Sequence, residues 1–437
     1  MMTIRRSLLV ALLLAVLLSM SKAQDATPTP TPIPAEMPRV DEGGHDIVNI
    51  LLMGSATSNG ANNPGLTDTL MIVSINRDSG HVAVVSIPRD LYVYVPALDA
   101  MHKINQAYFL TERTTENSGV PALRATVRYN LGLEIDYYAR VDFEGFGTLV
   151  DSLGGIHVAV DCAIEDWRLI DPDLDEDDPD NWEMFTLWTG LHWMSGDTAL
   201  WYVRSRRTSN DIDRTRRQQD VLRAIWRRIR QQGMLENFPD LWTQFNQMVE
   251  TDMTLPDALA LLPVVTELDA ADVAYYTFRI HQEVEQGYTD DEGRFIFLPN
   301  RDAIADLMQA VVVPPNSNRL SGHLPTVAIY NGSGVDGLAY VAAHRLERDG
   351  FRTTVIDDYT HPRRYNLIID YTGERKNSPL SLLQRILSTT TDGIQIDPTP
   401  DRAYDYEVRL GYTYQFYACT YPVEQPTLSE DDSASTD

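Results

Sequence analysis

The densest apolar pattern lies between Thr67 and Asp90, and it predicts two β-strands joined by a tight turn. Residues 70–75 are apolar on nearly both faces, which is typical of a buried strand. The turn is predicted at Asn76–Gly80, because its last residue can adopt a positive φ. A hairpin brings its two polar ends together, so we expect Asp68 and Arg89 to be close. An acid and an arginine at the rim of a sheet suit a metal-bound or phosphate-bearing ligand.

The pattern elsewhere predicts an α/β domain over residues 45–313. The expected strands are Ile47–Gly54, Tyr137–Phe143 and Ile156–Val160, and the expected helices are Pro121–Gly132 and Phe146–Leu153. Strands that alternate with helices indicate a sheet covered by helices. We therefore expect a central mixed β-sheet flanked by helices.

The last third of the chain predicts a second, smaller α/β domain. Residues 238–312 read as a mostly helical continuation with one strand-like stretch, and residues 314–323 as a linker. Strands and helices alternate again over residues 324–414. Within them, Asn331–Gly334 is similar to a phosphate-binding turn but lacks the Walker lysine, which favours a plain strand-to-helix turn. Residues 415–437 form a tail that is acidic at its end.

The N-terminus has the pattern of a targeting segment. Arg5 and Arg6 precede an uncharged apolar run at residues 8–20, which is short for a full membrane span. We expect residues 1–23 to be a signal peptide or an N-terminal membrane anchor. Residues 24–44 are rich in threonine and proline and predict an extended linker. With either alternative, the remainder is expected to be extracytoplasmic.

Composition narrows the range of functions. The chain has 437 residues, of which 43% are hydrophobic, enough for packed cores in two or three domains. Its net charge of -27 argues against a nucleic-acid partner, because phosphate backbones need a basic surface. The two cysteines, Cys162 and Cys419, are too few for a disulfide scaffold. Two free thiols are the simpler expectation, and one bridge is the alternative.

An acidic segment stands out at Asp166–Asn181, where eight of the residues are Asp or Glu. Closely spaced carboxylates can hold calcium. The spacing lacks the glycine and the distal glutamate of an EF-hand loop. We expect a solvated insertion, with a calcium site as the alternative.

The arginines are concentrated in residues 204–230, which contain ten arginines and no lysine. A helix is predicted at Thr215–Gln232. Four arginines precede or open this helix, near the positive end of its dipole, where anions bind well. They are Arg204, Arg206, Arg214 and Arg217.

Guanidinium groups match phosphate oxygens bidentately, so these four arginines suggest phosphate binding, with salt bridges to the abundant acids as the alternative. Four later arginines are expected to form a solvated face. They are Arg223, Arg227, Arg228 and Arg230.

Six ordered motifs between residues 47 and 233 resemble the LytR–CpsA–Psr family. They are L-T-D-T-L at 66–70, S-I-P-R-D at 86–90, K-I-N-Q-A-Y at 103–108, V-D-S-L-G-G-I at 150–156, G-D-T-A-L-W-Y-V-R-S-R at 196–206 and D-I-D-R-T-R-R-Q at 211–218. Residues 324–414 resemble the C-terminal domain that is often appended to LytR-type proteins.

The resemblance implies a phosphotransferase of the cell envelope. It would move a glycopolymer from a polyprenyl-pyrophosphate lipid to a hydroxyl of peptidoglycan or another wall acceptor, next to the membrane surface. The lipid would lie in an apolar cavity beside the sheet. The pyrophosphate would be surrounded by Arg89, Lys103, Arg204, Arg206, Arg214, Arg217 and Gln218.

The resemblance also implies catalytic and metal-binding roles. Asp68 would bind Mg2+, or Mn2+, in a way that depends on the lipid. Asp211 would orient the arginines or assist removal of the acceptor proton. The expected catalytic residues are therefore Asp68, Arg89 and Asp211.

Two positions depart from the family pattern. Ala56 replaces a usual second metal-binding aspartate, and Leu66 replaces an arginine. Both changes should weaken metal and phosphate binding, and Asp90 is a possible substitute ligand. One alternative function is therefore a non-catalytic protein that binds isoprenoid phosphate. A second alternative, a transcriptional attenuator, conflicts with the targeting segment and the acidic charge.

Overall fold

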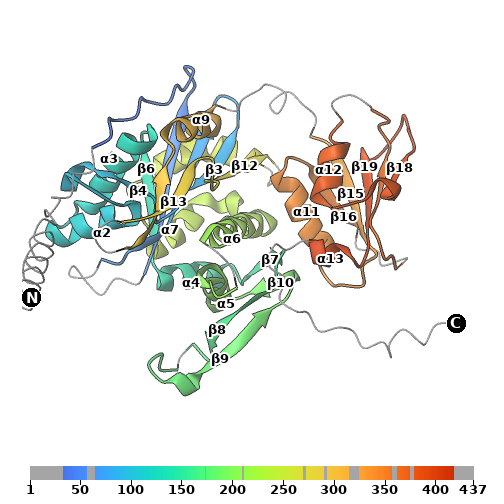
Figure 1. Cartoon of the computed structure of the whole chain (residues 1–437), viewed down its shortest axis with the longest axis horizontal. Helices are drawn as coiled ribbons and strands as arrows, with labels where there is room; N and C mark the ends of the chain where they lie inside the picture. Colours follow the sequence, from blue (N-terminus) through green and yellow to red (C-terminus); the bar gives the residue numbers. More distant parts are fainter. Residues whose placement is uncertain are drawn as a thin grey trace, which may run out of the picture. The chain divides into compact units, whose positions relative to one another are not determined.

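The structure is a computed structural model that describes residues 33–56, 64–172, 174–208, 211–268, 272–289, 293–313, 324–356, 362–374 and 378–417 (Figure 1). The predicted targeting segment, the linker at 314–323 and nearly all of the acidic tail lie outside these ranges, so the predicted domain boundaries stay predictions. Within the described ranges, no helix combines the length and the apolar character needed to cross a membrane.

A six-stranded mixed sheet forms the centre of the larger domain (Figure 1). Its strands lie in the order β11 (Glu250–Thr251), β6 (Tyr137–Val141), β1 (Ile47–Ser55), β2 (Thr67–Asn76), β3 (Val82–Ser86) and β12 (Val273–Thr277). β1, β2 and β3 pair in antiparallel fashion, whereas β6 and β12 run parallel to β1 and β3. The predicted hairpin is β2–β3, and its turn ends at Gly80 with a φ of 71°. The central mixed sheet is therefore confirmed.

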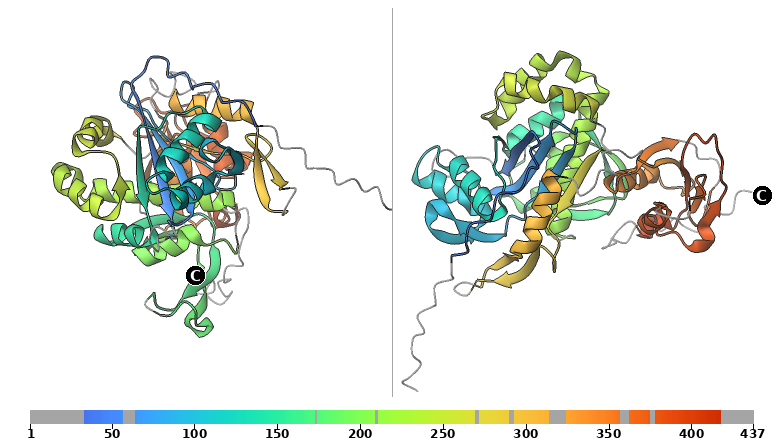
Figure 2. Two further views of the ribbon diagram at one scale, coloured as in Figure 1. Left: turned by 90° about the vertical axis from the view of Figure 1, so that its left-hand side faces the viewer. Right: turned by 90° about the horizontal axis from the view of Figure 1, so that it is seen from above.

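Helices cover both faces of this sheet (Figure 2). Alternate residues of a strand point to opposite faces, so Ile72 and Val85 join one core while Ile75 and Val84 join another. The first core is closed by α2 (Ile104–Thr114), α3 (Gly119–Leu131) and α9 (Arg301–Val312). The second is closed by α6 (Asp211–Gln231) and α8 (Leu255–Glu267).

The expectation for residues 238–312 was only partly correct. Helices α7 (Phe238–Met248) and α8 are present, and the strand-like stretch is β12. A second hairpin, β13 (Val284–Tyr288) with β14 (Phe295–Pro299), was not predicted. β14 does contain an apolar run, with Ile296 and Phe297 buried, but the run is only four residues long, and β13 has polar and exposed residues, so neither strand gave a clear signal.

A third layer packs on the outer side of α6. It contains α4 (Phe143–Ser152), α5 (Gly196–Arg204) and two antiparallel strand pairs, β7 (Ile156–Val160) with β10 (Gly190–Met194) and β8 (Ile164–Leu169) with β9 (Trp182–Leu187). α4 and α5 approach closely at Gly196, where a Cβ would lie 2.3 Å from the carbonyl oxygen of Gly147. This close packing sets the position of α5, whose last residue is Arg204.

The C-terminal domain is a smaller α/β unit, as predicted. Its five strands lie in the order β16 (Arg352–Ile356), β15 (Thr326–Asn331), β19 (Tyr406–Leu410), β17 (Leu367–Asp370) and β18 (Ile394–Ile396), with helices α11 (Leu338–Arg348), α12 (Leu380–Ile386) and α13 (Tyr414–Tyr417). In the glycine-rich turn after β15, the side-chain oxygen of Asn331 accepts hydrogen bonds from Ser333. These bonds are internal to the turn, as in a plain strand-to-helix connection.

The expected solvated arginine face on α6 is wrong for Arg223 and Arg227. Arg223 is 2% exposed and its Nη2 lies 2.7 Å from Glu347 Oε2 on α11, and Arg227 pairs with the same carboxylate. Asp220, also on α6, is buried against α11. These residues join α6 to the C-terminal domain, because that domain covers the face that the sequence pattern left polar.

Asp220 is the buried acid of this junction. Its carboxylate lies 2.9 Å from Arg348 and 3.2 Å from His344. Burial alone would raise the pKa of Asp220, but His344 and Arg348 outweigh it and hold that pKa well below its usual range. Asp220 therefore remains ionised in the interior.

Cys162, just after β7, is disulfide-bonded, so the expectation of two free thiols is wrong. The other cysteine of the chain, Cys419, lies outside the described residues.

The close contact of α4 and α5 generates a prediction about two glycines. Gly196→Ala should lower the free energy of unfolding by about 1–3 kcal/mol, because its methyl group meets backbone that cannot move aside. Gly147→Ala is the matched control, since open space surrounds its Cβ position and alanine favours a helix by about 1 kcal/mol. Urea unfolding of both variants checks the difference, and equal stabilities would contradict the proposed packing.

Candidate functional site

The side chain of Asp68 is aimed by an irregularity in the sheet. Gly54 pairs with Thr69, but the next residue, Ser55, pairs with Thr67, so Asp68 is an extra, bulged residue in β2. A bulge re-aims a side chain at the end of a strand. Asp68 Oδ1 accepts a hydrogen bond of 2.8 Å from Arg89 Nη1, which confirms that the two ends of the hairpin meet.

Arg89 lies among three carboxylates. Besides Asp68, its Nε lies 3.4 Å from Asp90 Oδ2 and 3.6 Å from Asp211 Oδ1. Burial works to lower the pKa of Arg89, but the hydrogen bond to Asp68 and the nearby acids outweigh it and raise that pKa. Lys103 Nζ lies 2.6 Å from Asp90 Oδ1, so the lysine holds Asp90 against the arginine.

Arg214 is the most buried member of the cluster, with 3% of its side chain exposed. Its Nη2 lies 2.7 Å from Asp211 Oδ1 and donates to the backbone oxygen of Asp68 at 3.3 Å. Burial lowers the pKa of Arg214 to about 10, and the positive charges of Arg206 and Arg89 act in the same direction against the opposing effect of Asp211. Arg206 and Arg89 therefore lie close enough to Arg214 to affect its charge.

The structure thus brings four of the predicted site residues into contact, and the charge of Arg206 acts on one of them, Arg214; we call these five residues the arginine cluster. They are Asp68, Arg89, Arg206, Asp211 and Arg214. They come from β2, the loop after β3, the loop after α5 and the first turn of α6. The N-terminal end of α6 adds the positive end of a helix dipole to this cluster. With three arginines and two aspartates, the cluster has a net positive charge, which favours an anion with several oxygens. The functional roles of these residues stay predictions.

Three predicted residues have other contacts. The guanidinium of Arg204 lies over the ring of Phe143, 4.2 Å from its centroid, and Gln218 donates weakly to the oxygen of Val203 at 3.5 Å. Arg217 is buried, donates to the oxygen of Ser205 and lies over the ring of Tyr202. Arg217 therefore stabilises the loop after α5 through its hydrogen bond to Ser205 and does not belong to the arginine cluster.

Asp166 is a contributor that sequence reasoning missed. It was assigned to a solvated acidic insertion, yet its Oδ2 accepts from the backbone N–H of Arg206 at 2.8 Å and of Arg207 at 3.3 Å. Asp166 therefore fixes the loop that carries Arg206. No local signal could show this, because the partners are 40 residues apart.

The described acids fit a magnesium ion that takes most of its ligands from a substrate. No three His, Cys, Asp or Glu side chains within the described ranges are arranged to hold a metal ion by themselves, and this includes the described part of the acidic segment. Asp68 is 31% exposed and offers one carboxylate. Magnesium commonly uses one or two carboxylates together with substrate phosphates and water.

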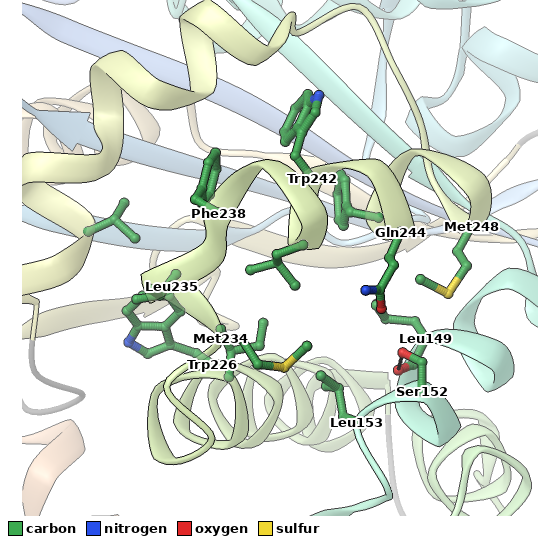
Figure 3. Close-up of a pocket in the computed structure, with 14 residues that line it drawn as sticks. Leu149, Ser152, Leu153, Trp226, Met234, Leu235, Phe238, Trp242, Gln244 and Met248 are labelled. Atoms are coloured by element: carbon green, nitrogen blue, oxygen red, sulfur yellow. Dashed lines mark hydrogen bonds between the residues drawn. The ribbon is translucent and has the colours of Figure 1, made fainter.

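A cavity of about 190 Å³ lies between α4, α6, α7 and α8 and is almost wholly apolar. Figure 3 shows Trp226, Met234, Leu235 and Phe238 around one space, with Ser152 and Gln244 together at one side. Such a cavity suits an aliphatic chain.

One helix, α6, connects this cavity to the arginine cluster. On α6, Arg214 belongs to the cluster and Trp226 lines the cavity, about 18 Å further along the helix. On α4, Leu149 lines the cavity, and Phe143, about 9 Å away along the helix, contacts Arg204, which lies outside the cluster. The charged cluster and the apolar cavity are therefore found near the two ends of one helix, α6.

Comparison with known proteins identifies relatives of this chain. Polyisoprenyl-teichoic acid–peptidoglycan teichoic acid transferase TagT of Bacillus subtilis is 28% identical over 232 residues, which are 52% of this chain and 67% of TagT. TagU of Bacillus licheniformis, of the same description, is 29% identical over 220 residues, which are 50% of this chain and 64% of TagU. The match with TagU thus covers less than two thirds of that relative.

A solved structure and two family models also match this chain. The crystal structure of B. subtilis TagV is 22% identical, has a TM-score of 0.50 and covers 64% of this chain and 99% of its own, which supports the fold. The model of the LytR_cpsA_psr family matches residues 17–296, and that of the LytR cell envelope-related transcriptional attenuator matches residues 325–414. Because the first match covers more than half of the chain and contains all six motifs, the protein belongs to the LytR–CpsA–Psr family.

Proposed function

We propose that the protein is an extracytoplasmic phosphotransferase that moves a glycopolymer from a polyprenyl-pyrophosphate lipid to a hydroxyl of peptidoglycan or another wall acceptor. The observation that carries the proposal is the position of the arginine cluster and the apolar cavity along the same helix, α6. Relatives named teichoic acid transferases support it at the level of the family.

In this proposal the donor pyrophosphate binds at Arg89, Arg206 and Arg214, and its prenyl chain extends toward the cavity. Arg204 and Gln218 border the same end of α6 and reach the phosphates or the first sugar. Phosphoryl transfer mainly needs positioning and neutralisation of the charge that develops on the phosphate oxygens. Arg89 and Arg214, which carboxylates hold in place before the donor arrives, supply both.

The reaction needs no covalent protein intermediate. The acceptor hydroxyl oxygen bonds to the phosphorus that carries the glycan, and the bond from this phosphorus to the bridging oxygen breaks. Prenyl monophosphate leaves, the glycan becomes attached through a phosphodiester, and the hydroxyl proton passes to a base or to water. Because Asp211 lies between Arg89 and Arg214, its contacts favour the orienting role over the basic one.

We propose that Mg2+, or Mn2+, binds at Asp68 together with the donor phosphates. When bound, it would neutralise charge on the pyrophosphate. Asp68 already positions Arg89, so its carboxylate would be shared between the arginine and the metal. Metal binding is therefore expected to be weak without the lipid.

An envelope location agrees with two features. Residues 1–23 have a signal-like or anchor-like pattern, and Cys162 is disulfide-bonded, which fits an oxidising compartment because disulfides persist mainly there. The membrane surface is the expected place of the lipid donor. A transcriptional attenuator, the description of the matched C-terminal family, fits poorly with a net charge of -27.

A non-catalytic isoprenoid-phosphate-binding protein is the second candidate, and one observation favours it. Ala56 and Leu66 face each other beside the bulge, with Ala56 N donating to Leu66 O at 3.4 Å. The family pattern has a metal-binding aspartate and a phosphate-binding arginine at these two positions. Both charged side chains are therefore absent from the same part of the site.

Removing the buried arginine should weaken donor binding. Arg214→Gln is expected to raise the dissociation constant for a detergent-solubilised prenyl pyrophosphate at least tenfold, because a charge-assisted hydrogen bond contributes about 1.5–3 kcal/mol. Arg113→Gln, an exposed position on α2, is the control. Isothermal titration calorimetry measures both, and equal affinities would contradict the phosphate-binding role.

Changing the carboxylates near the bulge should separate the two candidates. Asp68→Ala is expected to lower turnover by about a hundredfold or more while the fold persists, because Asp68 lies at a strand end. Ala56→Asp should strengthen magnesium affinity in the lipid-loaded protein and raise turnover. Calorimetry with and without prenyl pyrophosphate, followed by a transfer assay, tests both variants. Undiminished turnover in Asp68→Ala would reject its catalytic role, and lipid binding without any turnover would favour the non-catalytic candidate.

A further inference from the structure

The β8–β9 hairpin has an apolar face that is partly exposed to solvent. Paired residues of antiparallel strands share one face, and here the pairs are Trp167 with Met184 and Leu169 with Trp182. Trp167 is 53% exposed and Met184 is 37% exposed. Figure 1 shows the hairpin extending away from α4 and α5. Large exposed apolar patches usually mark a binding surface.

This face begins at the arginine cluster. Arg207, the neighbour of Arg206, pairs with Glu165 and donates to the sulfur of Met184 at 3.4 Å. Asp166 binds the backbone N–H groups of both arginines. The hairpin face is therefore continuous with the loop that carries a member of the phosphate site.

The hairpin is held firmly from its other side. Arg168 pairs with Asp197 on α5 at 3.0 Å and lies over the ring of Phe185, and Trp201 Nε1 donates to the oxygen of Trp167 at 2.9 Å. A surface fixed in this way loses little conformational freedom when a ligand binds.

The tip of the hairpin is strongly acidic, which limits the kind of ligand that this face can bind. The exposed acids are Asp171, Asp175, Glu176, Asp177, Asp178 and Asp180. They would repel an anionic glycopolymer, and they would repel the anionic surface of a membrane. An uncharged ligand with broad apolar faces would not be repelled.

We propose that the exposed face of β8–β9 is the docking surface for the acceptor, through the uncharged sugar backbone of a wall glycan strand. Sugar rings present C–H faces that pack on tryptophan and methionine, and hydroxyl groups that can bind Glu165 and Arg207. The face measures about 13 Å from Glu165 to Leu169 and directs a bound strand toward Arg206. This inference rests on the proposed transferase function, to which it adds the acceptor site.

The test uses calorimetry to measure the binding of a soluble oligomer of N-acetylglucosamine. Trp167→Ala should weaken this binding about tenfold, and Trp167→Phe should retain most of it because a flat ring remains. Tyr288→Ala removes an aromatic side chain, 69% exposed, from the other exposed hairpin and is the matched control. In the transfer assay, Trp167→Ala should raise KM for the acceptor with kcat and donor affinity unchanged. Thermal unfolding checks that all three variants fold.

The outcomes separate this proposal from the transferase function. Equal oligomer binding in Trp167→Ala and the unmodified protein would overturn the docking surface, even if transfer proceeds. Oligomer binding that depends on Trp167, in a protein that neither binds prenyl pyrophosphate nor transfers, would support the surface and reject the enzyme. If Trp167→Ala instead loses binding to vesicles of anionic lipid, or turns a dimer into a monomer, the face serves a membrane or a second copy and the proposal fails.

Discussion

The arginine cluster depends on the balance of charge around one carboxylate. Asp211 lies between Arg214, which is almost fully buried, and Arg89, which also pairs with Asp68. Without these acids, two guanidinium groups would repel each other in a site with little water, and burial would add a desolvation cost. The carboxylates therefore keep the arginines charged and in place before any anion binds. A donor pyrophosphate would find its positive partners already assembled.

Helix α6 connects this charged site with the C-terminal domain and with the apolar cavity. Its first turn carries Asp211 and Arg214, its middle carries residues that face the C-terminal domain, and its last turns line the apolar cavity. A shift of this helix would move the charged site and the cavity together. Close packing of α4 on α5 at Gly196 positions Arg204 at the same end. The positions of the charged site and the cavity thus depend on a few rigid helices.

Sequence reasoning could predict what strand pairing and helix dipoles determine locally. The contact of Asp68 with Arg89 follows from the hairpin, and the position of Arg214 follows from the start of α6. The bulge that aims Asp68 could not be predicted, because it arises from the register of β1 against β2.

Contacts between residues that are far apart in the sequence could not be predicted either. The sequence places Asp166 in an acidic run and Arg223 among the arginines of a helix, and both patterns predict a solvated position, whereas the structure gives each a partner. Arg217 was placed in the phosphate site by its motif, but the structure turns it toward Ser205 and Tyr202. A charged residue reveals its partner only when the chain has folded around it.

The junction of α6 with α11 has a consequence for how the chain reaches its final state. Arg223 is synthesised 124 residues before its partner Glu347, and Arg348 follows Asp220 by 128 residues. Until α11 has formed, the middle of α6 presents ionic groups whose eventual partners do not yet exist. The ion pairs between α6 and α11 can therefore form only after most of the polypeptide has been made. The C-terminal domain acts in this sense as a covalently attached folding partner, which arrives last and closes the charged side of α6.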